Sequence, residues 1–268
     1  MRNSLHRSYR LLALASAAAL FFAGCAQTSM APAADSALRD PQQNSAIRPE
    51  PREPGWVKRH EGFVEIAKQG GVDLLFLGDS ITDFWRREQT DRQVGGKKVW
   101  DREYGPRRAA NFGISGDRTQ HVLWRLQNGE LDGIKPKAIV LMIGTNNTGF
   151  ERDNTTSRNT PAQAAEGVRE IVRLLRARLP QTKILLLAVF PRGEKPDHPQ
   201  RLQVNEINRL IAQLGDGRNV RFLDLGPKFL AADGTLPKDI MSDFLHPGEK
   251  GYEIWAAAIK EPLAQMLK

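Results

Sequence analysis

The chain has 268 residues, with 39 Lys and Arg against 31 Asp and Glu and a formal net charge of +8. The basic residues are interleaved with acidic ones, and no basic stripe with intervening aromatic residues occurs, which argues against nucleic acid as a partner. Attraction to anionic lipid or polysaccharide remains compatible with this charge. Five scattered histidines and one cysteine form no metal-ligand pattern, so we expect no metal site.

Residues 1–25 predict an export signal. Three arginines precede the apolar stretch 11–22, which is too short for a membrane-spanning helix of about 20 residues. The stretch ends in Phe22-Ala23-Gly24-Cys25, which resembles a bacterial lipobox, although Leu is usual where Phe22 stands. The resemblance implies lipidation of Cys25 and a protein exported to and lipid-anchored in the bacterial cell envelope, facing the periplasm or the surface. The alternative is a cleaved signal with an incidental cysteine.

Residues 26–55 are rich in Ala, Pro, Ser, Gln and Asn and predict a flexible tether. Residues 56–268 remain as one domain of ordinary size. Since the chain has a single cysteine, no internal disulfide is available and the domain must depend on its core.

Apolar patterning divides this domain into alternating helices and strands. Short unbroken apolar runs predict strands covered on both faces, and apolar residues at helical spacing predict helices. In chain order the pattern gives a helix over 56–69, strands over 72–77 and 109–112, a helix over 119–128, a strand over 137–143, a helix over 161–179, a strand over 183–190, a helix over 199–214, a strand over 220–223 and a helix over 249–267. This alternation indicates right-handed crossovers and an α/β fold, a three-layer α/β/α sandwich.

Polar residues that carry chemistry stand where these strands end, which is where parallel sheets bind ligands. The first strand is followed by Gly78-Asp79-Ser80, the second by residues 113–117 (GISGD) and the third by residues 144–147 (GTNN). A fourth block, residues 243–246 (DFLH), precedes the last helix. Ser80 alone would cap a helix more often than act as a nucleophile.

Together these residues fit the requirements of ester hydrolysis. A serine hydroxyl needs a base such as His to become nucleophilic, and the His needs a carboxylate that fixes its tautomer. Asp243 and His246 are three residues apart, a spacing that can place both side chains on one face. An oxyanion needs donors already in position, which the N–H groups of Ser80 and Gly116 and the side chain of Asn146 could provide.

The blocks GDS, NFGISGD, GTNN and DFLH, in this order, resemble the SGNH (GDSL-type) serine hydrolases, and most closely the catalytic subunits of platelet-activating-factor acetylhydrolase. The resemblance covers about residues 72–265. It implies a flavodoxin-like, doubly wound parallel sheet and no cofactor. It also implies Ser80 as nucleophile, His246 as base, Asp243 as its orienting acid, and an oxyanion hole of Ser80, Gly116 and Asn146. No G-x-S-x-G motif surrounds Ser80, which argues against the α/β-hydrolase alternative.

The same resemblance indicates the substrate. Ile81, Thr145 and Leu245 stand at positions that keep the acyl pocket short in those acetylhydrolases, so we expect a short-chain (acetyl) ester. The first hypothesis is a carbohydrate or cell-envelope acetylesterase. The alternatives are a short-chain phospholipid acetylhydrolase and a lipid-anchored glycan-binding protein without turnover. The resemblance also allows a homodimer.

Several nearby residues have simpler interpretations. We expect Asp79 to be a structural cap or a brace of its loop rather than a second base, and Asn147 to form a local turn through its side chain. Asp117 and Arg118 would support the next helix. Trp85 is expected in the core, with the mouth of the site near Ser80 as the alternative.

Overall fold

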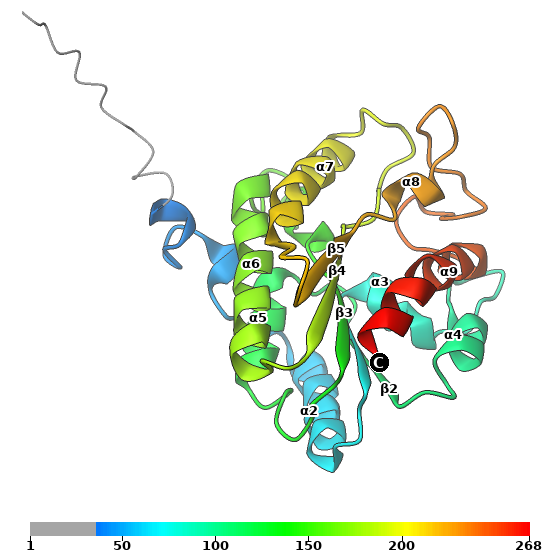
Figure 1. Ribbon diagram of the computed structural model, residues 1–268. Coiled ribbons are helices and arrows are strands. Elements are labelled where there is room, and N and C mark those ends of the chain that lie inside the picture. The colour runs from blue at the N-terminus through cyan, green and yellow to red at the C-terminus, as the bar shows by residue number, and fades with distance from the viewer. Residues whose placement is uncertain (1–35) are drawn as a thin grey trace, which may run out of the picture.

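The computed structural model describes residues 36–268 and shows a five-stranded, all-parallel sheet between two layers of helices (Figure 1). The strand order is β2-β1-β3-β4-β5, which is the order of flavodoxin-like doubly wound sheets. The strands are β1 (Leu74–Gly78), β2 (Ala109–Gly113), β3 (Ala138–Met142), β4 (Lys183–Leu187) and β5 (Val220–Leu223). The predicted α/β/α sandwich is therefore confirmed. The predicted export signal and Cys25 lie outside the described residues.

The helices divide between the two faces of the sheet (Figure 1). One face is covered by α2 (Pro54–Gln69), α5 (Thr119–Gln127), α6 (Pro161–Arg178) and α7 (Pro199–Ile211), and the other by α3 (Ser80–Asp83), α4 (Lys97–Glu103), α8 (Gly226–Phe229) and α9 (Glu249–Met266). The short 3-10 helices are η1 (Ser45–Ile47), η2 (Phe84–Arg86), η3 (Thr145–Asn147) and η4 (Ala212–Leu214). Within residues 36–268, no helix has the length and hydropathy required to cross a membrane.

The five long helices and all five strands match the predicted elements, apart from a few residues at their ends. β1 and β3 are buried along their whole length because helices cover both sides, which explains the unbroken apolar runs. The predicted start of α6 is also confirmed, since the Thr160 side chain accepts a bond from the Gln163 N–H. α3, α4 and α8 were not predicted because elements of four to seven residues are too short to show periodicity.

The segment 44–53, which we call the N-terminal strap, packs against α5 and α6. Ala46 is fully buried and its carbonyl accepts the Thr119 hydroxyl at 2.8 Å, while the Glu50 N–H donates to the Gln120 carbonyl at 3.3 Å. A Cβ at Gly167 would lie 2.8 Å from the Ala46 carbonyl oxygen, so this glycine admits the strap. The prediction of a flexible tether as far as residue 55 is wrong for the strap. It is held by main-chain and small polar contacts, which leave no apolar signal in the sequence.

Candidate active site

Ser80 lies at the carboxyl end of β1, where it is the first residue of α3 and only 4% exposed. The preceding Asp79 caps this helix as predicted, because its Oδ1 accepts the Ile81 N–H at 3.0 Å. The N–H of Ser80 belongs to the first helical turn, where no intrahelical acceptor exists. The strand-to-helix junction therefore presents both the hydroxyl and the main-chain N–H of Ser80 at the sheet edge.

Ser80, His246 and Asp243 form one hydrogen-bonded line. Ser80 Oγ lies 2.9 Å from His246 Nε2, and His246 Nδ1 lies 2.6 Å from Asp243 Oδ2. An ionised Asp243 accepts the Nδ1 proton, which leaves Nε2 free to accept the serine proton. Burial opposes ionisation of Asp243, but bonds from the His246 ring and from the N–H groups of Leu245 and His246 outweigh it and lower its pKa to about 2.

The turn that carries Asp243 and His246 has an unusual backbone. Phe244 adopts a φ of 58°, in the left-handed region that non-glycine residues rarely enter. Its N–H donates to the Met241 carbonyl at 2.9 Å, and its carbonyl accepts the Gly193 N–H at 2.8 Å. The Phe84 ring packs 4.9 Å from the His246 ring. The contacts from Phe84 and Gly193, which hold this turn against the rest of the edge, could not be predicted from the sequence.

The three predicted oxyanion donors lie after three neighbouring strands, β1, β2 and β3. Gly116 has a φ of 82°, a conformation that favours glycine. One Nδ2 hydrogen of Asn146 bonds the Asp117 carbonyl at 2.9 Å, which ties Asn146 to the loop of Gly116. Its second Nδ2 hydrogen has no acceptor among residues 36–268. Gly116 and Asn146 line the same cavity.

The predicted acyl-pocket residues also lie on the segments that follow the strands at this edge. Ile81 and Thr145 are buried directly after β1 and β3, and Leu245 is partly buried in the turn between Asp243 and His246. Arg192 holds Thr145 through bonds from Nη1 to its carbonyl (3.0 Å) and its hydroxyl (3.2 Å). Arg192 follows β4 in the chain, and the sequence analysis gave it no role in the site.

Three charged side chains, which we call the buried ion cluster, support the loop of Gly116: Asp117, Arg125 and Glu130. Arg125 Nε lies 3.0 Å from Asp117 Oδ2, and Arg125 Nη1 lies 2.5 Å from Glu130 Oε1. Trp56 Nε1 donates to Asp117 Oδ1 at 2.6 Å. Burial raises the pKa of Asp117 to about 6, against the lowering effect of Arg125 and of the Trp56 bond. Asp117 thus connects α2 and α5 to the loop that carries Gly116.

The structure corrects the interpretation of Asn147 and decides between the two interpretations of Trp85. Asn147 does not form a local turn with its side chain: it is fully buried, its Oδ1 accepts the Thr119 N–H at 3.1 Å and its Nδ2 donates to Asn159 Oδ1 at 2.9 Å. It therefore links α5 to the loop before α6. Trp85 lies wholly in the core and not at the mouth of the site.

Two cavities open beside this group of residues. The histidine-side cavity, of about 580 Å³, includes Phe84, Asp243 and His246. The arginine-side cavity, of about 550 Å³, includes Gly116, Asn146 and four arginines: Arg52, Arg118, Arg152 and Arg158. Among residues 36–268, no group of His, Cys, Asp and Glu side chains could hold a metal ion.

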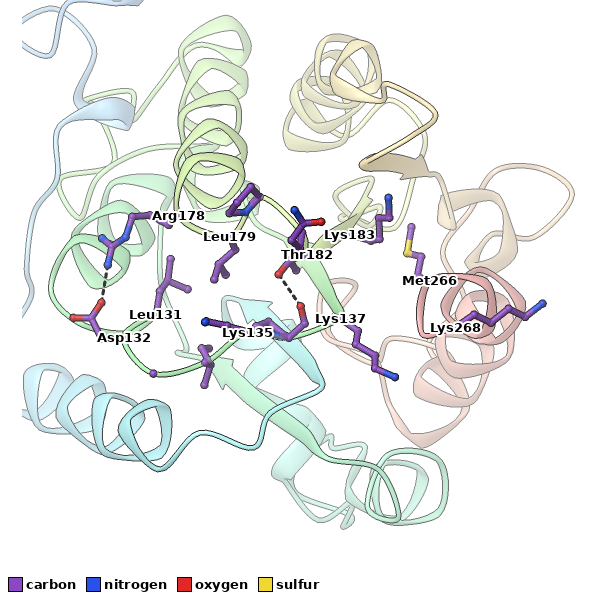
Figure 2. A pocket seen from close by; sticks show the side chains of 15 residues that line it. Leu131, Asp132, Lys135, Lys137, Arg178, Leu179, Thr182, Lys183, Met266 and Lys268 are labelled. Atoms are coloured by element: carbon purple, nitrogen blue, oxygen red, sulfur yellow. Dashed lines mark hydrogen bonds and ion pairs between the residues drawn. The ribbon is translucent and has the colours of Figure 1, made fainter.

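A larger cavity of about 700 Å³ lies at the opposite edge of the sheet (Figure 2). Lys137 and Lys183, which stand at the starts of β3 and β4, line it, and the Thr182 hydroxyl donates to the Pro136 carbonyl beside it at 2.6 Å. It contains none of the residues predicted for the site. Cavity size alone therefore does not locate the active site.

The fold and the grouping at its carboxyl edge agree with the family comparison. The model of the GDSL-like Lipase/Acylhydrolase family matches residues 76–254, and the chain belongs to this family. The protein is accordingly a carboxylic ester hydrolase.

Particular relatives define its place more closely. The chain is 38% identical over 214 residues to platelet-activating factor acetylhydrolase IB subunit alpha2 of Homo sapiens, which covers 80% of this chain and 85% of that one. A GDSL-like lipase from Bacteroides thetaiotaomicron superposes with a TM-score of 0.59 at 21% identity, covering 78% of this chain and 97% of the other. An acetylxylan esterase from Geobacillus stearothermophilus does so with a TM-score of 0.56 at 21% identity, covering 74% and 94%.

Proposed function

We propose that the protein is a serine esterase that hydrolyses short-chain acetyl esters through Ser80, His246 and Asp243. The observation that carries this proposal is the continuous line of hydrogen bonds, 2.9 Å from Ser80 to His246 and 2.6 Å from His246 to Asp243. Membership of a family of acylhydrolases supports it.

In the proposed mechanism, Ser80 Oγ attacks the carbonyl carbon while His246 Nε2 takes its proton. The carbonyl electron pair moves onto oxygen, and the N–H groups of Ser80 and Gly116 and the free Nδ2 hydrogen of Asn146 stabilise the resulting oxyanion. His246 then returns the proton to the alcohol oxygen as its bond to carbon breaks. Water then attacks the acyl-serine with His246 again as base, and His246 gives this proton to Ser80 Oγ as the bond from Oγ to the acyl carbon breaks, which releases the acetyl group as acetic acid, ionised to acetate. Asp243, with a pKa of about 2, stays ionised throughout.

The acyl group would lie against Ile81, Thr145 and Leu245. Two of these residues are buried and held by other groups: Tyr252 donates to the Ile81 carbonyl at 2.8 Å, and Arg192 binds Thr145. Because these residues are held in place, the pocket cannot widen easily. We therefore expect kcat/KM for p-nitrophenyl esters to fall at least tenfold from acetate to octanoate, since each methylene that the pocket cannot hold costs about 1 kcal/mol or more. Equal activity on the two esters would contradict a short acyl pocket.

For the alcohol half, we favour an acetylated carbohydrate or cell-envelope sugar. The similarity to an acetylxylan esterase and the predicted anchor at Cys25 in the cell envelope support this choice. A short-chain phospholipid is the second candidate, supported by the acetylhydrolase relatives. Substitution of Cys25 by Ser should release the protein from the membrane fraction if the anchor exists. Assembly as a homodimer is part of the proposal and can be measured by light scattering.

The decisive assay compares wild type, Ser80→Ala and Ser157→Ala on p-nitrophenyl acetate. Loss of the nucleophile should lower kcat by about 10⁶-fold, to or below the limit of detection. Ser157 is exposed in the loop before α6 and serves as the matched control. A glycan-binding protein without turnover would instead show no activity in any of the three.

A further inference from the structure

The arginine-side cavity adjoins the proposed oxyanion donors, since Gly116 and Asn146 form part of its wall. An ester held at Ser80 with its acyl group against Ile81, Thr145 and Leu245 must direct its alcohol elsewhere. This cavity lies next to two of the three proposed oxyanion donors, and its volume of about 550 Å³ suits a sugar-sized group.

Arg158 has hydrogen-bond donors to spare in this cavity. Its Nη1 donates to the Asn146 carbonyl at 2.9 Å, whereas its buried Nε has no hydrogen-bond partner in the part of the chain described. The nearest acid, Glu151, has Oε2 3.8 Å from that Nε, which is too far for a hydrogen bond. Glu151 is instead engaged by Arg118 in two bonds of 2.5 and 2.6 Å. Burial and the charge of Arg118 lower the pKa of Arg158, and the charge of Glu151 offsets only part of this effect.

The rest of the lining is also arranged to donate. His121 Nδ1 accepts the Arg118 N–H at 2.9 Å, so the proton of the neutral ring is on Nε2. Burial, reinforced by nearby arginines, lowers the pKa of His121 to about 3 and keeps the ring neutral at pH 7. Arg52 donates to the Ser115 carbonyl at 2.8 Å, and its guanidinium lies 3.2 Å from where a Cβ on Gly116 would be.

The acids of the lining already have partners of their own. Glu53 Oε2 lies 3.5 Å from Arg52 Nε, and Asp153 accepts three bonds within its own turn from Thr155 and Thr156. Exposed Arg152 has no partner among residues 36–268. The lining carries four arginines against three acids, Glu53, Glu151 and Asp153, so its net charge is positive.

We propose that this cavity binds an anionic group, a carboxylate or a phosphate, on the alcohol half of the acetyl ester, with Arg158 and Arg152 as its main ligands. The inference rests on the proposed esterase function. A planar guanidinium with free N–H groups matches the oxygens of either anion. Because Arg158 also holds the main chain of Asn146, a bound anion would place the ester carbonyl close to the oxyanion donors.

The test uses two pairs of substrates that differ by one anionic group: an O-acetyl methyl glucoside against the matching methyl glycoside of O-acetyl glucuronic acid with its carboxylate free, and acetylglycerol against acetylglycerol phosphate. In wild type we expect kcat/KM for at least one anionic ester to exceed its neutral partner by about ten- to hundredfold, mainly through KM, as hydrogen bonds to charged groups allow. The preferred pair tells a carboxylate from a phosphate ligand.

Variants assign the preference to the cavity. Arg158→Gln and Arg152→Gln should each reduce the anionic-to-neutral ratio severalfold, and Arg158→Lys should restore part of it by keeping the charge. The matched control is Arg173→Gln, an exposed arginine of α6 paired only with Glu170. Arg158 also contacts Asn146, so the ratio is the readout and not the rate itself. A wild-type ratio near one for both pairs, or a ratio that neither variant changes, overturns the inference. Activity on p-nitrophenyl acetate would then persist, whereas failure of the esterase proposal abolishes it.

Discussion

Asp243 and Asp117 show how differently two parts of one sheet edge treat a carboxylate. The side chain of Asp243 is 50% exposed and its pKa is about 2, whereas Asp117 is fully buried and its pKa is about 6. Both face a basic side chain, His246 in one case and Arg125 in the other. The presence of a basic partner therefore does not explain the difference.

Solvent and main-chain donors do explain it. Asp243 keeps part of its hydration, and three hydrogen bonds from Leu245 and His246 outweigh the effect of its partial burial, so its charge is stable at any pH at which an esterase would act. Asp117 loses nearly all hydration, and its charge depends on Arg125 and its neighbours. The half-exposed Asp243 is suited to stabilising a transient imidazolium, and the buried Asp117 is suited to holding the Gly116 loop in place.

Among the changes that test this comparison of the two carboxylates, Asp243→Asn should have the largest effect. The amide can still accept from the N–H groups of Leu245 and His246, but it cannot stabilise the His246 imidazolium, so kcat should fall by about 10³- to 10⁴-fold. The free energy of unfolding should fall by no more than about 2 kcal/mol, because the hydrogen bonds that lower the pKa of Asp243 stabilise its charge but the half-exposed site is screened by solvent. Steady-state kinetics and urea denaturation on the same preparation measure both. A tenfold or smaller loss of kcat would show that the Asp243 carboxylate is not needed for turnover.

The complementary change, in the buried ion cluster around Asp117, is Arg125→Met. It leaves Asp117 and Glu130 buried without their cation and removes the bond from Arg125 to the Phe112 carbonyl, so the free energy of unfolding should fall by about 3–5 kcal/mol. Arg173→Met removes an exposed pair with Glu170 and should cost less than about 1 kcal/mol. Urea denaturation of the three proteins decides the matter. If Arg125→Met were as stable as the control, the buried ion cluster would not be a structural support.

Much of this molecule could be predicted because its signals are local. Unbroken apolar runs located the five strands, and the residues after them located the edge that carries Ser80, Gly116 and Asn146. The spacing of Asp243 and His246 predicted their contact. The pairing of Ser80 with His246, 166 positions away in the sequence, came from the family resemblance, because no local pattern encodes it.

The features that were missed depend on contacts between distant polar groups. The N-terminal strap is held by bonds such as Thr119 to the Ala46 carbonyl, which leave no periodicity in residues 44–53. In the sequence, Arg125 and Arg158 look like ordinary surface arginines. Nothing there indicates that Arg125 is buried, or that Arg158 Nε has no hydrogen-bond partner in the part of the chain described. Asn147 was assigned to a local turn because Asn is common in turns, yet its partners lie on α5 and in the loop before α6.

Asp79 offers a smaller and sharper test, since it adjoins Ser80 but is only 1% exposed. Burial raises its pKa from 3.8 to about 7, against the bond from the Ile81 N–H, and its Oδ2 has no partner in the part of the chain described. Between about pH 4 and pH 7 the folded protein holds this proton and the unfolded chain does not, so the contribution of Asp79 to the free energy of unfolding falls as pH rises. The full difference corresponds to roughly 4 kcal/mol, at 1.36 kcal/mol for each pKa unit.

Asp79→Asn keeps the cap on Ile81 and removes the titration. The variant should therefore gain stability relative to wild type as pH rises from 4 to 8, by up to the few kcal/mol just given, in urea denaturation at matched pH values. Asp153→Asn provides the opposite case: hydrogen bonds from Thr156 and Thr155 lower the pKa of exposed Asp153 to about 2, so its stabilising effect is lost only as pH falls below about 4. A difference in unfolding free energy between wild type and Asp79→Asn that did not change from pH 4 to pH 8 would mean that Asp79 is ionised throughout this range. Asp79 would then resemble Asp243, because burial would not govern its charge.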